Sequence, residues 1–428
     1  MQRMQKSLAE GVELAVCRTE QFKTGLLSVT LAVPLAAQTA TVNALAPEVL
    51  CRGSRRYPDM EQLSAATDRL YGAALGPSVR QRGESQCVSL QCSFIDDRYA
   101  LDGAALLEPA AGLMGEVLLD PATRDGVFRA DYVESEGVNL ADDIRARIND
   151  KRGWSIFRMT QEMCAGEAYA LDKLGDAQEA AAMTARRLWD GYQDLLRGAR
   201  VIFYYGGSAD PRRVEEAVTR SFAPLLRPRK TALPCRVVEG PAGPVRRVTD
   251  RLEVTQGKLA MGFRTGGVTM GTPLYPALLV CNALYGGTAH SKLFENVREK
   301  MSLCYFASSM LDGVKGIMAV SSGVEFSDFD RAEQAILEQL EAVRRGDFTR
   351  AELDAALRAV VNGLVSRRDS QGQLRDEWLT RLLSPRGGLD GELLARVVEQ
   401  VTGDDVAQAA RLIRLDTVYR LEGEEDGG

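Results

Sequence analysis

The sequence predicts an α+β protein made of two homologous halves. Strand and helix patterns mix along the chain without the strict alternation that is typical of a parallel sheet. Segments of the first half also recur, in the same order, in the second half. With 428 residues, of which 45% are hydrophobic, the chain can bury two large cores or about three smaller ones of roughly 150 residues each.

Apolar stretches that alternate or are rich in β-branched residues predict strands, and the segments with helical periodicity predict helices. The predicted strands are residues 26–35, 88–95 and 201–207, and the predicted helices are residues 60–72, 103–119, 131–150 and 180–196.

The internal repeat defines the expected domain boundaries. Residues 225–247 are rich in Pro, Gly and charge and form the natural linker, so we expect an N-terminal half at 1–224 and a C-terminal half at 248–428. Four pairs of segments match across this linker at offsets of roughly 217 to 233 residues: 44–53 with 277–286, 70–72 with 303–305, 126–135 with 346–355, and 201–206 with 418–423.

Composition excludes several classes of function. The net charge is −6 and the basic residues are scattered, which argues against a nucleic-acid surface. No segment approaches the roughly 18 apolar residues of a membrane span, and no signal peptide is visible, so we expect a cytoplasmic protein. The eight cysteines contain no CxxC pair and are expected to be buried free thiols. A single histidine excludes mechanisms that need two imidazoles in one chain.

Two motifs resemble signatures of the pitrilysin or insulinase family of zinc peptidases. GSRRYP occupies residues 53–58, and the longer GGTAHSKLFENVREKMSLCYFASS occupies residues 286–309. Together with QGKLAMGFRT (256–265) and DRLYGAALGPSV (68–79), they are most similar to the branch whose members lack the metal site. The resemblance covers nearly the whole chain and implies that each half is a mainly antiparallel sheet packed against helices.

The resemblance implies a degenerate metal site in the N-terminal half. Active members carry HxxEH, in which two histidines bind zinc and the glutamate activates the zinc-bound water. Aligned on GSRRYP, these positions fall on Ala44, Pro47 and Glu48, and two further acidic positions fall on Glu136 and Asp143. Ala44 has no donor atom and Pro47 has no carboxylate, so we expect no metal, no cofactor and no catalytic residue. We also expect the helix to begin late or to bend at Pro47.

The resemblance also implies a substrate-binding motif in the C-terminal half. In members of the family, an arginine and a tyrosine seven residues apart hold and polarise the scissile peptide, and these positions fall on Arg298 and Tyr305 in this sequence. A guanidinium can bond a peptide carbonyl, and a phenol can donate to a developing oxyanion. His290 is expected to cap the nearby helix or to line a chamber. Gly286 and Gly287 could present backbone amides to an anion, although a Gly pair is also ordinary turn chemistry.

The residue pattern alone also allows a purely structural role for this segment. Leu293, Phe294, Val297 and Met301 form an apolar stripe, beside which Arg298 would be a surface residue.

The resemblance implies a non-catalytic, substrate-holding subunit that forms a heterodimer with a zinc-bearing HxxEH paralogue and acts on a peptide or unfolded polypeptide. The alternative is a binding or scaffold protein without proteolysis, involved in the 5-aminopentanol modification of elongation factor P. A third possibility, an independently active enzyme, requires a metal site built from carboxylates alone, which select poorly for zinc.

Overall fold

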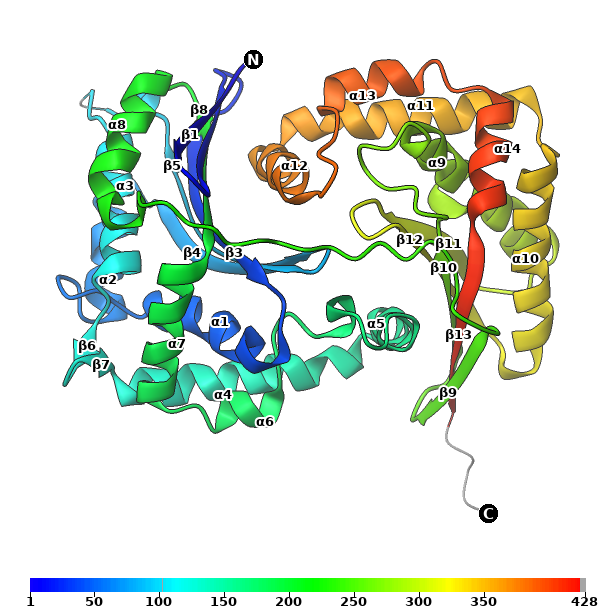
Figure 1. The fold of residues 1–428 in the computed structure, drawn as a ribbon, viewed down its shortest axis with the longest axis horizontal. Coiled ribbons are helices and arrows are strands. Elements are labelled where there is room, and N and C mark those ends of the chain that lie inside the picture. Colours follow the sequence, from blue (N-terminus) through cyan, green and yellow to red (C-terminus); the bar gives the residue numbers. More distant parts are fainter. Residues whose placement is uncertain (102, 424–428) are drawn as a thin grey trace. The chain divides into compact units, whose positions relative to one another are not determined.

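The computed structural model describes residues 1–101 and 103–423, which form two compact units (Figure 1). Of the described residues, unit 1 contains 1–101, 103–145, 171–234 and 370–379, and unit 2 contains 146–170, 235–369 and 380–423. The two units are defined by which residues pack together, whereas the two halves were defined by the sequence repeat. The expected linker at residues 225–247 therefore stays a prediction. Within the described residues, no helix has both the length and the apolar content that crossing a membrane requires.

Unit 1 is built on a six-stranded sheet with the strand order β1-β2-β8-β3-β5-β4. All its neighbouring strands run antiparallel except β2 and β8, which are parallel. Helices α3 and α8 lie side by side against it (Figure 1). The elements are β1 (Gln2–Ala9), β2 (Val12–Arg18), β3 (Thr24–Pro34), α1 (Ala37–Leu50), α2 (Met60–Asp68), β4 (Ala74–Arg82), β5 (Ser85–Ile95), α3 (Leu107–Leu119), β6 (Thr123–Arg124), β7 (Val127–Phe128), α4 (Ala130–Ala146), α6 (Ala177–Ala181), α7 (Ala185–Gly198), β8 (Arg200–Gly207) and α8 (Pro211–Ser221).

Unit 2 is built on a five-stranded sheet with the strand order β11-β12-β10-β13-β9. Its one parallel pair is β13 with β9. Two segments have π-helical hydrogen bonding, at Ala283–Gly287 and Leu293–Lys300. The other elements are α5 (Lys151–Met163), β9 (Arg246–Leu252), β10 (Gly257–Arg264), α9 (Tyr275–Asn282), β11 (Phe306–Asp312), β12 (Ile317–Val324), α10 (Phe329–Arg345), α11 (Arg350–Ser366), α13 (Gly391–Val398), α14 (Gly403–Leu412) and β13 (Arg414–Gly423).

The two sheets share one topology, which confirms the predicted α+β fold of two homologous halves with mainly antiparallel sheets. Five strands of unit 1 appear in unit 2 in the same spatial order, with β2, β8, β3, β5 and β4 corresponding to β9, β13, β10, β12 and β11. The four sequence matches fall on corresponding places, since the first lies on α1 and α9 and the last lies on β8 and β13. The repeat in sequence is therefore a repeat in structure.

One helix of each half packs in the unit of the other half. Helix α5 packs against β10 and β13 of unit 2, where the sulfur atoms of Met159 and Met163 fill the space beside Gly262. The first part of α12 (Gln371–Leu383) belongs to unit 1, where the Gln371 side chain donates to the Thr24 carbonyl at 2.6 Å. The chain order alone does not reveal this exchange.

Two local expectations are corrected by the structure. Helix α1 begins at Ala37 and contains Pro47 in its interior, so the expected late start is wrong. Burial of the helix from Ala40 to Leu50, Glu48 excepted, offsets the roughly 3 kcal/mol that an interior proline costs. The helix predicted at residues 180–196 is broken, because the Thr184 hydroxyl accepts from the Arg187 amide and starts a new helix, α7, at Ala185.

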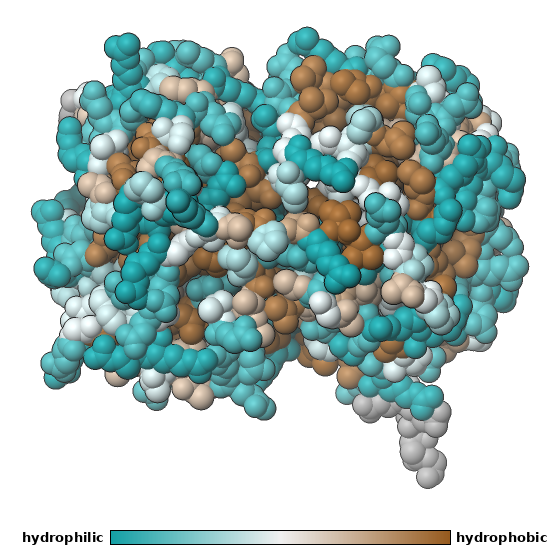
Figure 2. All heavy atoms as spheres, in the orientation of Figure 1, coloured by the Kyte–Doolittle hydropathy of each residue, from teal (hydrophilic) through white to brown (hydrophobic). Residues whose placement is uncertain are grey.

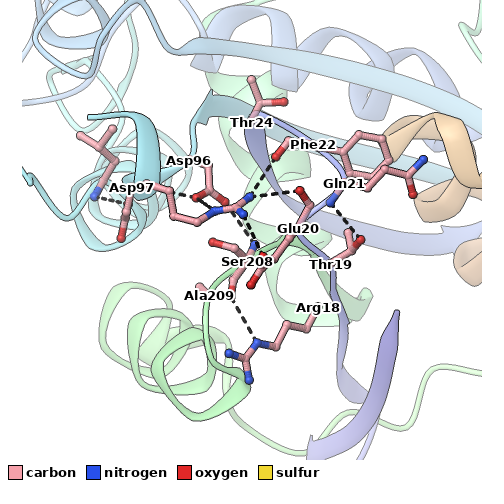
Figure 3. Close-up of polar contacts among 12 residues, drawn as sticks. Arg18, Thr19, Glu20, Gln21, Phe22, Thr24, Asp96, Asp97, Ser208 and Ala209 are labelled. Atoms are coloured by element: carbon pink, nitrogen blue, oxygen red, sulfur yellow. Dashed lines mark hydrogen bonds and ion pairs between the residues drawn. The ribbon is translucent and has the colours of Figure 1, made fainter. Parts of the chain in front are cut away.

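The loop between β2 and β3 is fixed to the end of the unit 1 sheet by one buried carboxylate (Figure 3). Asp96 follows β5 and accepts from the Arg98 side chain at 2.8 Å and from the Ser208 amide at 3.2 Å. Arg98 in turn donates to the carbonyls of Glu20 and Phe22 in that loop. Burial alone would raise the pKa of Asp96, but the bonds from Ser208 and Arg98 outweigh it and lower the pKa.

Candidate functional site

The positions of the degenerate metal site lie on α1 in unit 1. Ala44 is 1% exposed, Pro47 is buried and Glu48 is half-buried. The helix is held to its sheet by a polar pair, in which the Asn43 amide donates to Gln86 at 3.0 Å and the Gln86 amide donates to the Ala40 carbonyl at 2.9 Å. Apolar packing and this pair fix the helix without any metal.

The acidic positions on α4 lie near Glu48. Glu136 accepts from the Arg52 guanidinium at 2.9 Å and from the Asn139 amide at 3.0 Å. Burial, followed by the negative charges of Glu136 and Asp143, raises the pKa of Glu48. Asp143 itself is exposed. The structure thus brings Glu48, Glu136 and Asp143 into one acidic cluster, in which Arg52 compensates Glu136.

These residues do not fit the zinc ion that the resemblance would associate with this position. Cys51, which is half-buried, is close by, but desolvation and the charges of Glu48 and Glu136 raise the pKa of its thiol to about 12, so it is protonated at neutral pH. In the described part of the chain, no group of three or more His, Cys, Asp or Glu side chains is arranged to hold a metal ion. Hydrolysis by a metal-bound water therefore has no basis in this cluster.

The glycine pair in unit 2 serves packing. Gly286 is buried at the end of the first π-helical segment, and a Cβ there would lie 2.7 Å from the Leu293 side chain and 2.8 Å from the Ser309 amide nitrogen. At Gly287 a Cβ would lie 3.0 Å from the Asn282 carbonyl oxygen. Gly286 thus lets this segment pass close to β11, which explains the glycine without an anion.

Arg298 and Tyr305 lie at the same end of the unit 2 sheet. Arg298 lies in the last turn of the second π-helical segment. Its side chain is 38% exposed, with its guanidinium 3.2 Å from Glu299 and 4.5 Å from the ring centroid of Phe294. The residue before Tyr305 is Cys304, whose pKa is raised by burial and partly lowered again by the positive charge of Arg298. Tyr305 is 60% exposed and precedes β11. Both polar groups are accessible to a ligand within unit 2.

Glu325 is a site residue that sequence reasoning missed. It follows β12, and its carboxylate accepts from the Tyr305 hydroxyl at 2.5 Å. This hydrogen bond and the Glu325 charge raise the pKa of Tyr305. The single phenolic hydrogen points at Glu325, so a ligand carbonyl must replace Glu325 to accept it. Glu325 lies 20 residues beyond Tyr305. Tyr305 precedes β11 and Glu325 follows β12, so the register of this hairpin brings them together, and no side-chain pattern in the sequence marks the pair.

The remaining predicted residues have simpler surroundings. His290 is 79% exposed and lies 3.9 Å from Glu295. The Ser291 hydroxyl, not the imidazole, accepts from the Phe294 amide at the start of the second π-helical segment. Met301 is 44% exposed, so its predicted place in the apolar stripe is wrong. The wider π-helical turn changes the angle between successive residues and carries this position out of the stripe.

A separate apolar hollow lies in unit 2. Figure 2 shows hydrophobic side chains gathered over the part of this unit that contains α9, α11 and α13. The hollow has a volume of about 450 Å³. It can accept an apolar side chain, and it is lined by Met270, Gly271, Thr272, Pro273, Tyr275, Pro276, Arg386, Gly388, Leu389, Leu394 and Val397.

Comparisons with known proteins give one family-model match to part of the chain and similar proteins over nearly all of it. Residues 182–360 match the family model described as Peptidase M16 inactive domain. The chain is 33% identical over 420 residues to a Bacillus subtilis protein named Probable inactive metalloprotease YmfF, with 98% of each chain covered. A crystal structure of a conserved protein from Enterococcus faecalis is similar over 100% of both chains, with a TM-score of 0.91 and 26% identity. The peptidase M16 inactive domain from Pseudomonas fluorescens gives a TM-score of 0.78 at 17% identity, with 99% of each chain covered.

Proposed function

Because the chain belongs to the peptidase M16 family, as an inactive member, we propose that it is the substrate-holding subunit of a heterodimeric peptidase or peptide-processing complex. Its partner would be a paralogue that carries HxxEH and the zinc ion. The family membership confirms the resemblance inferred from the sequence motifs. The partner, the peptide substrate and a cytoplasmic location remain parts of the proposal.

One observation carries the proposal, namely the contrast between the two predicted sites. The cluster of Glu48, Glu136 and Asp143 has no arrangement suited to zinc, whereas Arg298 and Tyr305 keep accessible polar groups. A guanidinium has five N–H donors, and Arg298 directs one of its nitrogens at Glu299. The phenol of Tyr305 donates to Glu325, and a peptide carbonyl that replaced Glu325 would accept the same hydrogen. These groups can bind a peptide carbonyl, whereas the described residues of the α1 and α4 cluster offer no arrangement that would hold a zinc ion.

The test is reconstitution of the chain with its HxxEH paralogue. We expect Arg298→Ala and Tyr305→Phe each to lower kcat/KM for peptide cleavage roughly a hundredfold, because each removes a donor to the scissile carbonyl. Arg331→Ala and Tyr99→Phe are the controls, since they change an exposed arginine and an exposed tyrosine away from this motif. Unchanged cleavage by both site variants would sink the proposal.

A second candidate is a binding protein without proteolysis that acts in the 5-aminopentanol modification of elongation factor P. It is favoured by the internal contacts of the pair, since Tyr305 donates to Glu325 and Arg298 lies beside Glu299 and Phe294. A strain that lacks both the chain and its paralogue distinguishes the two candidates. If the 5-aminopentanol modification of elongation factor P returns when the chain is supplied with a paralogue whose HxxEH glutamate is replaced, binding is sufficient for the modification. If the modification returns only with the intact paralogue, peptide cleavage is required.

A further inference from the structure

A pocket in unit 1 connects the GSRRYP motif with helices α2 and α3. Its volume is about 430 Å³, which lies in the range of small-ligand sites. All of its lining residues belong to unit 1, whereas the candidate substrate site lies in unit 2. We call it the Tyr57 pocket, and it is lined by Arg56, Tyr57, Ala66, Arg69, Leu70, Pro109, Gly112, Leu113 and Glu116.

The loop that carries Arg56 and Tyr57 is fixed by one buried hydroxyl. Ser54 is fully buried, and its hydroxyl donates to the Glu116 carboxylate on α3 at 2.9 Å and accepts from the Tyr57 amide at 3.1 Å. The Ser54 amide in turn donates to the Tyr57 carbonyl at 2.8 Å. These bonds tie the loop to α3 before any ligand arrives, so binding has little ordering cost.

Two guanidinium groups of the pocket have no carboxylate partner in the part of the chain that the structure describes. The guanidinium carbon of Arg56 lies 5.4 Å from the ring centroid of Tyr57, and that of Arg69 lies 6.0 Å from it. Both arginines are exposed. The neighbouring Arg55, by contrast, forms an ion pair with Asp120 at 2.7 Å. Arg56 and Arg69 therefore give the rim of the pocket a positive charge that a ligand oxyanion can neutralise.

The other walls of the pocket offer one acceptor and an apolar surface. Glu116 is half-buried, and the Ser54 hydroxyl bonds to its Oε1, which leaves its Oε2 able to accept from a ligand N–H. Leu113 is buried and Leu70 is half-buried, and both face the pocket. At Gly112 an added Cβ would meet no atom within 4 Å, so the pocket is open beside this residue.

These groups together select one kind of ligand. Inorganic phosphate would leave the apolar wall uncovered, a hydrocarbon would leave both guanidinium groups without a partner, and a basic peptide would be repelled by them. With two arginines and one glutamate, the lining carries one net positive charge, which a single carboxylate balances. The last residue of a peptide has that carboxylate, a neutral amide N–H on the same Cα and a side chain, whereas a free amino acid has a second charge on its nitrogen.

We propose that the Tyr57 pocket binds the C-terminal residue of a peptide that ends in an apolar side chain. The terminal carboxylate lies at the guanidinium groups of Arg56 and Arg69, as in other sites that capture a chain terminus through fixed donors. The last amide N–H donates to Glu116, and the apolar side chain packs on Leu70 and Leu113. The proposal does not depend on the proposed function, because no residue of the candidate substrate site takes part in it.

The test uses the full chain and the peptide Gly-Ser-Gly-Ser-Leu with fluorescein on its N-terminus, and binding is followed by anisotropy. We expect saturable binding that is roughly tenfold weaker for the same peptide with a C-terminal amide, because the amide carries no charge for the guanidinium groups. A peptide that ends in glycine is also expected to bind roughly tenfold more weakly, because it buries no apolar side chain. Unlabelled N-acetyl-leucine should compete better than free leucine, whose ammonium group adds a charge.

Variants of the pocket locate the binding. Arg56→Gln and Arg69→Gln should each weaken binding roughly three- to tenfold at low salt, because each removes a positive charge from the rim. Gly112→Phe should abolish binding by filling the open side of the pocket, and urea denaturation should find this variant as stable as the wild-type chain. Arg186→Gln is the control, since this arginine is 67% exposed on α7 and lies outside the pocket.

Four outcomes would overturn the proposal. The amide could bind as well as the free acid, or both arginine variants and Gly112→Phe could keep the wild-type affinity. Free leucine could compete as well as N-acetyl-leucine, which would rule out a preference for a peptide terminus. Finally, no saturable binding could occur below about 1 mM peptide, a concentration that corresponds to only about 4 kcal/mol of binding free energy.

Discussion

Corresponding positions in the two units carry carboxylates with opposite roles. Asp96 follows β5 in unit 1 and is buried, whereas Glu325 follows the corresponding strand β12 in unit 2 and is exposed. Asp96 fixes a loop through Arg98 and Ser208 (Figure 3), while Glu325 accepts from the accessible phenol of Tyr305. The same place at the end of a sheet is thus structural in one unit and part of a candidate site in the other.

Other corresponding positions are used alike in both units. Gly53 follows α1 and Gly286 follows α9, and they occupy the same place in the sequence repeat. A Cβ at Gly53 would lie 2.6 Å from the Tyr57 carbonyl oxygen, and one at Gly286 would lie 2.8 Å from the Ser309 amide nitrogen. The fold therefore requires a glycine where one backbone segment passes close to another. It does not fix which side chain follows β5 or β12 at the end of each sheet.

The largest effect is expected from filling these two close approaches. Gly53→Ala and Gly286→Ala should each lower the free energy of unfolding by about 2–4 kcal/mol. The nearest atoms at Gly53 are all backbone, and at Gly286 the Ser309 amide nitrogen stands beside two side-chain atoms, so a backbone shift is needed at both. Urea denaturation measures this change. The matched controls are Gly112→Ala in α3 and Gly363→Ala in α11, where the added methyl meets no atom within 4 Å and a small stabilisation is expected. Equal behaviour of the glycines and their controls would contradict the shared constraint.

A smaller effect is expected from the buried carboxylate that only unit 1 has at its sheet end. Asp96→Asn should cost about 1–3 kcal/mol at pH 7, because the charged acceptor of the Arg98 and Ser208 bonds is lost. The folded pKa of Asp96 is lowered, so its contribution is fully present above the ordinary aspartate pKa of about 4 and is lost as the pH falls through the folded value.

The difference in stability between the wild-type chain and Asp96→Asn should therefore shrink only below about pH 4. Urea denaturation at pH 7 and at acidic pH measures it. Asp194→Asn serves as the control, since its carboxylate is 76% exposed and its ion pair with Arg197 is a surface pair of little net value. A difference that vanished already at pH 6 would argue against the lowered pKa.

The sequence predicted what depends on periodicity and local motifs. Strands β3, β5 and β8 are apolar and were predicted close to their bounds, and the repeat indicated the shared topology. The edge strands β1 and β9 were not among the predicted strands, because they are polar and contain no fully buried residue. The family resemblance located Arg298 and Tyr305, but Glu325 meets Tyr305 only through the pairing of neighbouring strands.

The smallest effect, and one of opposite sign, is expected at the degenerate metal site. Burial and the charges of Glu136 and Asp143 raise the pKa of Glu48, so the charged form of Glu48 destabilises the folded chain. Below the ordinary glutamate pKa of about 4.3, Glu48 is protonated in both states and no destabilisation exists; it develops as the pH rises through the folded value. Glu48→Gln should therefore stabilise the chain at pH 7 by no more than about 1 kcal/mol and have little effect near pH 4. Glu134→Gln, on the exposed face of α4, is the control. Destabilisation by Glu48→Gln at pH 7 would mean that the charged carboxylate has a partner it needs, and the view of this cluster as a site without a metal role would have to be abandoned.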